Sequence, residues 1–80
     1  MSAQELATQL RDQVVPLLDS SALDFFDTYF EAGEWEIAIG LAAETLFKAG
    51  RAVPEAVLEY EDDISSTVLD GIRESVTAAA

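Results

Sequence analysis

Residues 23–50 read LDFFDTYFEAGEWEIAIGLAAETLFKAG. Apolar residues recur in this stretch every three or four positions, the period of an α-helix, on both sides of Gly33. They are Leu23, Phe26 and Phe30 before this glycine and Trp35, Ile39, Ala42 and Leu46 after it. Gly33 can take the left-handed conformation that ends helices, and the second apolar run ends near Gly50. The stretch therefore predicts two helices joined by a tight turn, with Ala38 and Ala43 small enough to let another helix approach closely.

The residues before this stretch predict one more helix. Ser2, with Glu5 three positions later, is typical of a capping box. The apolar residues that follow at four-residue spacing are Leu6, Leu10 and Val14. This first helix is predicted to end near Pro16, and Ser20 or Ser21 can cap the second helix.

The residues after Gly50 carry one long apolar stripe. Pro54 is well placed as the first residue of another helix. The stripe consists of Val57, Tyr60, Ile64, Val68, Ile72 and Val76. It predicts one long helix; the alternative is a break near residues 63–66, where Ser65 can cap a separate last helix. No run combines strict alternation with turn signals on both sides, so the sequence predicts an all-α fold, a small compact bundle of four or five helices in a single acidic domain over residues 1–80.

The composition excludes several classes of function. Sixteen Asp and Glu against four Lys and Arg give a net charge of −12, which disfavours nucleic acid and anionic membranes and favours basic proteins as partners. The chain has neither His nor Cys, so the common acid–base, nucleophilic and transition-metal designs are absent and we expect no enzyme activity, no cofactor and no metal. The lack of Cys, of a secretion signal and of an apolar run of roughly 18 residues predicts a cytoplasmic protein.

Acidic residues are densest across the Gly33 turn. Like charges one helical turn apart, as at Asp27 and Glu31, destabilise a helix by tenths of a kcal/mol, so their repetition along the chain suggests a use. We predict that this zone, with Trp35 or Tyr29 as an aromatic anchor, meets a basic groove on a partner protein. The predicted partner-binding residues are Asp24, Asp27, Glu31, Glu34, Trp35 and Glu36. The alternative is that the acids only form solvated helix faces and that Trp35 and Phe30 are core residues.

The segment from Phe25 to Ile39 resembles the helix, Gly-Glu-aromatic-Glu-x-Ala turn and helix of the MafI-type immunity proteins. Its distinctive part is Gly33-Glu34-Trp35-Glu36 with Ala38. The next helix and the linker of that family correspond to Thr45-Leu46-Phe47 and Val53-Pro54-Glu55. The chain departs from the family at Ala49-Gly50-Arg51. The resemblance covers roughly residues 23–72. It implies a cytoplasmic protein encoded with a polymorphic bacterial toxin, which it binds and neutralises before secretion. Many such toxins are nucleases with a basic substrate groove, which an acidic face could cover by imitating phosphates.

Two other functions stay open. One is a non-catalytic helical adaptor or scaffold that docks an amphipathic segment of a partner in an apolar groove. The other is a small metal-binding or carboxylate-dependent enzyme. The known di-metal carboxylate bundles also use His, which this chain lacks. The oligomeric state is open as well, because Phe25, Leu41 and Leu58 are left over for a second core face or a subunit interface.

Overall fold

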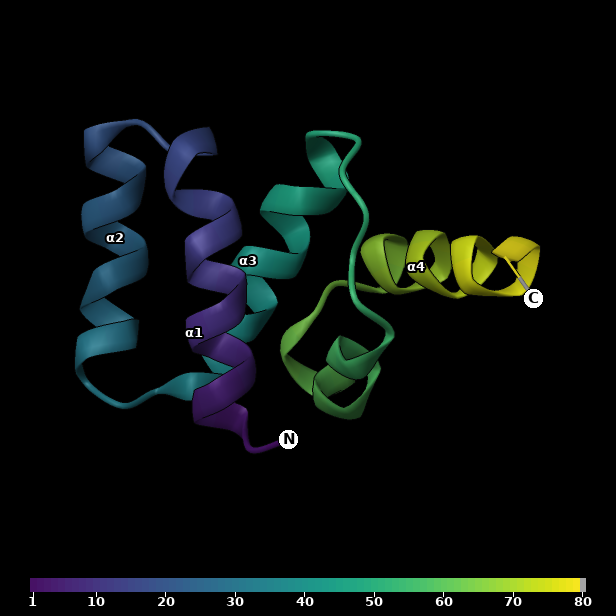
Figure 1. Ribbon diagram of the computed structural model, residues 1–80, viewed down its shortest axis with the longest axis horizontal. Coiled ribbons are helices and arrows are strands. Elements are labelled where there is room, and N and C mark those ends of the chain that lie inside the picture. Colours follow the sequence, from purple (N-terminus) through teal and green to yellow (C-terminus); the bar gives the residue numbers. More distant parts are fainter. Residues whose placement is uncertain (80) are drawn as a thin grey trace.

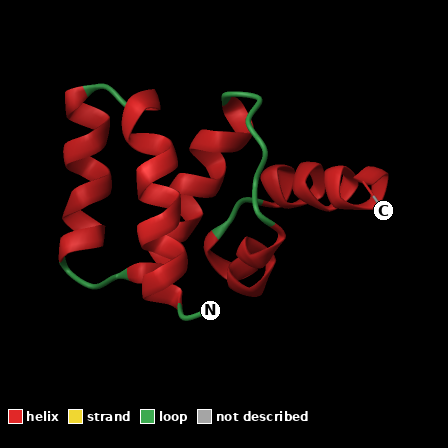
Figure 2. Cartoon of the chain, in the orientation of Figure 1, coloured by secondary structure: helices red, strands yellow, loops and turns green. Residues whose placement is uncertain are grey.

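The chain folds into helices without any strand in the part that the structure describes (Figure 2). The computed structural model describes the backbone of residues 1–79 and the side chains of residues 1–75. The helices are α1 (Ala3–Val14), the short 3-10 helix η1 (Val15–Leu17), α2 (Ser20–Glu31), α3 (Trp35–Lys48), the 3-10 helix η2 (Glu55–Asp63) and α4 (Ser66–Ala79). With η1 counted as the end of α1, these described elements are five helices, and the predicted all-α fold is confirmed.

Helix α3 is the centre of the fold. The helices α1, α2, η2 and α4 all contact it, with α1 and α2 to one side and η2 and α4 to the other (Figure 1). Because α3 has neighbours on several sides, it is apolar around most of its circumference. Its buried residues are Ala38, Ile39, Gly40, Ala42, Ala43 and Leu46. The expectation that Ala38 and Ala43 allow close approach is confirmed, since both are fully buried.

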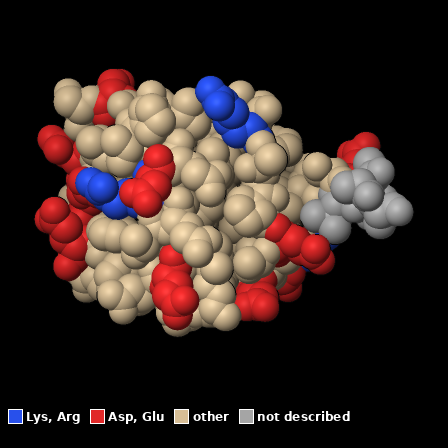
Figure 3. Space-filling view, in the orientation of Figure 1, with Lys and Arg blue, Asp and Glu red and all other residues tan. Residues whose placement is uncertain are grey.

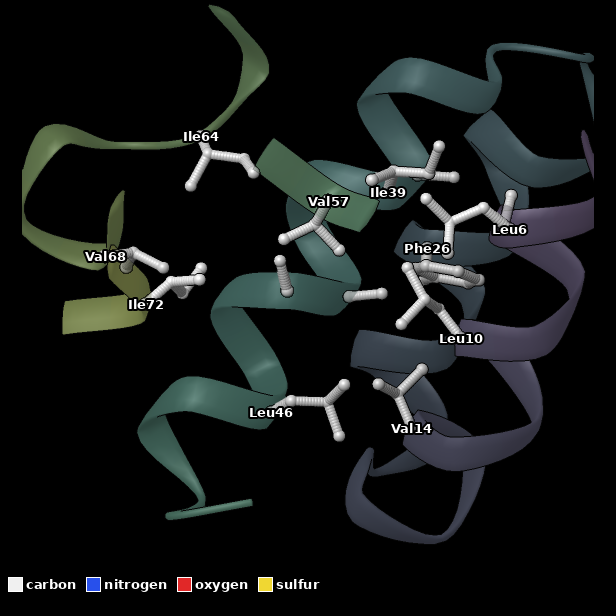
Figure 4. Packing of buried hydrophobic residues seen from close by; sticks show 14 of the residues in the cluster. Leu6, Leu10, Val14, Phe26, Ile39, Leu46, Val57, Ile64, Val68 and Ile72 are labelled. Carbon is white, nitrogen blue, oxygen red and sulfur yellow. The ribbon is translucent and has the colours of Figure 1, made fainter. Parts of the chain in front are cut away.

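A single cluster of buried hydrophobic side chains joins both sides of α3. Leu6 and Leu10 of α1 face Phe26 of α2 on one side (Figure 4). On the other side, Val57 and Ile64 of the η2 region and Val68 and Ile72 of α4 face α3 (Figure 4). The apolar stripes predicted for the separate helices therefore meet in one core around α3.

Gly40 sets how closely η2 approaches α3. The backbone carbonyl of Asp63 lies directly over Gly40, where a Cβ atom would collide with it. Any larger residue at position 40 would push the end of η2 away from α3. A glycine in the middle of a helix, normally unfavourable, is explained here by this close contact.

Local hydrogen bonds fix the ends of the helices. The Ser2 hydroxyl accepts a hydrogen bond from the Glu5 N–H at 3.1 Å, as the predicted capping box requires. Gly33 has a φ of 77°, and the Gly33 and Glu34 N–H groups donate to the carbonyls of Phe30 and Tyr29 at 3.2 and 3.0 Å. This is a Schellman motif, so the predicted end of α2 at Gly33 is confirmed. Gly50 ends α3 in the same way, with a φ of 70°.

The prediction that Ser20 or Ser21 caps α2 is wrong. Asp19 is the cap: its backbone is extended and its carboxylate accepts a hydrogen bond from the Ala22 N–H at 2.8 Å. The physical reason is that η1 ends at Leu17, which leaves Asp19 as the last extended residue before the helix. A carboxylate is also the better partner for the positive end of a helix.

The prediction of one long helix after Pro54 is also wrong, and the alternative break is confirmed. Tyr60 has a non-helical backbone inside η2, Ile64 is extended, and the Ser65 carbonyl accepts the first hydrogen bond of α4 from Leu69 at 2.9 Å. Pro54, with a ψ of 138°, stands before η2 and not in it. A straight helix over residues 55–79 would be about 37 Å long, whereas α3 is about 21 Å long. One end of such a helix would extend beyond α3 and make no contact with it. Val76, the last residue of the predicted stripe, lies outside the described side chains.

Candidate functional site

The six predicted partner-binding residues do not form one surface. Asp24 and Glu31 share one face of α2, because seven residues correspond to almost two full turns. Both are exposed to solvent. Figure 3 shows acidic side chains along the edge of the molecule that α2 forms, with a basic side chain set among them. This face of α2 is free to meet a partner.

Asp27 is engaged inside the protein. Its two carboxylate oxygens accept hydrogen bonds from Nε and Nη2 of Arg11 on α1, each at 2.9 Å. These hydrogen bonds hold the pKa of the Asp27 carboxyl below its ordinary value and raise the pKa of the Arg11 guanidinium. Only 20% of the Asp27 side chain is exposed. Asp27 therefore links α1 to α2, which is a structural role, and it adds little charge to the outer face of α2.

Trp35 is partly buried. Its ring meets the Phe30 ring edge to face with centroids 5.3 Å apart, and Phe30 stacks on the buried Phe26 at 6.0 Å. The Arg11 guanidinium lies 5.5 Å from the centre of the Phe30 ring. Both Trp35 and Phe30 are partly buried against the core. Both residues therefore pack against the core without belonging to its fully buried part, and Trp35 also lines a hollow on the surface.

Glu34 and Glu36 belong to a different surface from Asp24 and Glu31. Together with Trp35, Asp63 and Ala3 they line an open hollow of about 400 Å³ at the start of α3. Asp63 was not among the predicted residues, because only the packing of η2 on α3 brings it to Glu34 and Glu36. In the part of the chain with described side chains, no group of three or more carboxylates is arranged to hold a metal ion.

The basic residues are largely neutralised within the fold. Arg11 pairs with Asp27, Lys48 with Glu44 in the same helix and Arg73 of α4 with Glu61 of η2. These three ion pairs use only three of the sixteen acidic side chains. Among the described side chains none that is polar or charged is buried. The remaining acids therefore give the surface a negative potential that the protein itself does not compensate.

An apolar groove between α2 and α3 was missed by the sequence analysis as a site. Its volume is about 430 Å³, and its apolar lining is made by Leu18, Ala22, Phe25, Phe26 and Leu41. Phe25 stands at its rim with 56% of its surface exposed. The ring of Phe25 meets Tyr29 edge to face at 5.4 Å, so Tyr29 is held beside the groove. The only sequence signal was that Phe25 and Leu41 were left over from the predicted stripes.

Comparisons with known proteins do not identify a function for this chain. Among the described residues no helix combines the length and the apolar character that crossing a membrane requires. No family model, no curated protein and no solved structure matches this chain. The similarity to the MafI-type immunity proteins therefore stays a prediction.

Proposed function

We propose that this protein is a non-catalytic immunity protein that acts in the cytoplasm by binding and neutralising a basic toxin, of the nuclease type. The observation that carries the proposal is the uncompensated acidic surface, which includes the outer face of α2 with Asp24 and Glu31. The resemblance of the Gly33 region to the MafI-type proteins supports the same function.

The spacing of the acids suits a polycationic partner. Asp24 and Glu31 lie about 10 Å apart along α2, close to the Debye length of about 8 Å at physiological salt. A groove that binds the phosphates of a nucleic acid carries several Lys and Arg side chains, so two carboxylates this far apart can meet different cations. The wider negative potential steers such a partner to the surface and raises the association rate. Covering the groove excludes the nucleic acid, and no catalytic group is needed.

The first experiment identifies the partner and tests the face. Tagged protein is used to capture partners from lysate of the source cells at about 0.05 and 0.5 M salt. A basic protein with toxic activity, bound stoichiometrically and released by salt, is the expected result. The purified partner is then titrated with the double variant Asp24→Lys/Glu31→Lys.

The matched control is Asp70→Lys/Glu74→Lys, which changes the charge equally at exposed positions of α4. We expect the α2 variant to lose at least tenfold in affinity, mostly through a slower association rate, and to leave the toxin active. The α4 variant is expected to lose much less. Equal losses in both variants would assign the effect to total charge and would contradict a binding face on α2.

A second candidate function is a non-catalytic adaptor, which the exposed Phe25 beside the apolar groove favours. Salt separates the two functions. Binding steered by charge weakens steeply as ionic strength rises, whereas docking in an apolar groove responds little.

A further inference from the structure

Phe25 is an exception among the aromatic residues of α2. Its neighbour Phe26 is buried in the core, while Phe25 keeps 56% of its surface in solvent at the rim of the groove between α2 and α3. An exposed aromatic ring beside an open apolar groove is typical of a surface that anchors a partner. The groove volume of about 430 Å³ is within the usual range for binding pockets.

The charges around the groove restrict what can occupy it. Asp19 lines the groove directly, and Asp24 lies next to Phe25 in the sequence, about 100° around α2. None of the residues that line the groove is basic. A second copy of this chain is disfavoured, because two molecules of net charge −12 repel each other. A segment that carries both apolar and basic side chains could pack against the apolar lining and pair with the acids at the rim.

We propose that the groove between α2 and α3 is a docking site for a basic amphipathic helix of a partner protein, whose apolar side chains bury Phe25 and whose Lys or Arg side chains meet Asp19 and Asp24. This is the helix-in-groove mode of recognition, in which apolar residues three or four positions apart act as anchors. The proposal goes beyond the acidic face, since it names an apolar anchor with its own affinity. It shares with the proposed function only the basic character of the partner.

The arrangement on α2 lets one partner use both surfaces. The outer face with Asp24 and Glu31 and the rim with Phe25 are neighbouring parts of the same exposed side of the helix. A helix seated in the groove therefore lies beside the acidic face. Charge steers its approach, and burial of Phe25 slows its dissociation. The contribution from burial depends little on ionic strength.

The test uses synthetic helical peptides of about four turns as probes, so that it does not depend on any toxin. Two peptides share one Leu face at helical spacing and differ only on the polar face, which carries Lys and Arg in one and Glu in the other; a third has the basic composition in scrambled order. Each is titrated into the full chain while backbone amide resonances are followed by NMR. We expect saturable binding of the basic amphipathic peptide alone, with the largest shifts at the groove residues Ala22, Phe25 and Thr45.

Variants assign the site. Phe25→Ala is expected to lower the affinity of the basic amphipathic peptide about tenfold, at high salt as well as at low salt. Phe47→Ala removes another partly exposed phenylalanine, away from the groove, and is expected to leave the affinity unchanged. Circular dichroism of both variants checks that the helices are intact.

Several results would overturn the proposal. Equal binding of the scrambled basic peptide, or shifts confined to acidic residues and insensitive to Phe25→Ala, would show attraction by charge alone. Equal binding of the Glu-faced peptide would show that the groove does not select a basic partner. A dimer of the free protein in sedimentation, dissociated by Phe25→Ala, would make a second copy the occupant. If the groove binds as expected and no toxin is captured, only the proposed toxin partner fails.

Discussion

The ion pair between Arg11 and Asp27 allows a direct test of which acids hold the fold and which are free. Asp27→Asn removes the negative charge but keeps the size of the side chain. The paired hydrogen bonds at 2.9 Å are charge-assisted, and such bonds contribute about 1.5–3 kcal/mol when well shielded. The two side chains are 32% and 20% exposed, which reduces the contribution through screening by solvent. We expect Asp27→Asn to lower the free energy of unfolding by about 1 kcal/mol, a fall of about 4–8 °C in Tm for a domain of this size.

Urea unfolding at pH 7 followed by circular dichroism measures this loss. Asp24→Asn is the matched control, because Asp24 is exposed on the same helix and makes no ion pair among the described residues; its change should stay within about 0.5 kcal/mol. A double-mutant cycle with Arg11→Met, which keeps an apolar stem but removes the guanidinium that lies over Phe30, should return a coupling free energy of about 1 kcal/mol. Equal effects of the two Asp variants, or no coupling with Arg11, would refute the structural role of Asp27.

The same pair predicts a dependence on pH. The pKa of Asp27 is lower in the folded protein than in the unfolded chain, because Arg11 donates hydrogen bonds to its carboxylate. The stability that this carboxylate contributes is therefore complete above its unfolded pKa of about 4 and is lost as the pH falls through the lower folded value. The difference in unfolding free energy between the wild type and Asp27→Asn should be constant from pH 7 to about pH 5 and should shrink at lower pH. A difference that grows on acidification would contradict this sign.

Substitutions of glycine test the packing and the turn. Gly40→Ala should lower the free energy of unfolding by about 1–2 kcal/mol, because the clash with the Asp63 carbonyl outweighs the better helix propensity of alanine; urea unfolding measures it. Gly71→Ala is its control and should cost little or stabilise, because the three atoms nearest to the new methyl group all belong to the ring of Phe47, a partly exposed side chain that can rotate away. Equal losses at both glycines would contradict the close contact at Gly40. Gly33→Ala should cost about 1 kcal/mol through its positive φ alone, since no atom lies closer than 4.0 Å to the added methyl group; no loss in Tm would contradict the strain.

The helices could be predicted because their signals are local. The Ser2 cap and the glycine ends at Gly33 and Gly50 each depend on a few consecutive residues, whose hydrogen bonds form within one turn. The apolar period of α3 likewise needs no knowledge of its neighbours. From these features the sequence predicts the all-α class and the boundaries of the first three helices, apart from the cap at Asp19.

The last third of the chain could not be predicted in this way. Whether it forms one helix or two depends on how much of it can pack against α3. The spacing of Val57, Ile64, Val68 and Ile72 continues through the break, so the stripe fits a long helix and two shorter ones equally well. The choice is made by the length of α3, against which both Val57 and Ile72 are buried. Within residues 55–79, Ser65 indicates that a break is allowed but not that the chain adopts it.

The candidate site depends on the rotation of α2 against its neighbours. Asp24, Asp27 and Glu31 follow one another at intervals of three and four residues, but only Asp27 turns toward α1 and pairs with Arg11, sixteen residues earlier. In the same way, Phe26 turns into the core and Phe25 onto the rim of the groove. An acidic zone read from sequence therefore contains residues with different roles, which only the packing separates.

The distribution of charge argues that the excess acid is not needed for folding. The ion pairs of Arg11 and Arg73 join different helices, α1 to α2 and η2 to α4. The partly buried pair of Arg11 and Asp27 stabilises the fold, whereas solvent screens the more exposed pair of Arg73 and Glu61, which contributes little. A net charge of −12 exceeds the magnitude of about 2–8 that keeps a small domain soluble, and its self-repulsion lowers stability. A basic partner that binds only the folded protein would remove this repulsion and stabilise it in proportion to its affinity. Relief of the repulsion among the unpaired acids then supplies part of the binding free energy. A search for the partner should therefore select first for basic charge and second for a segment that fits the apolar groove.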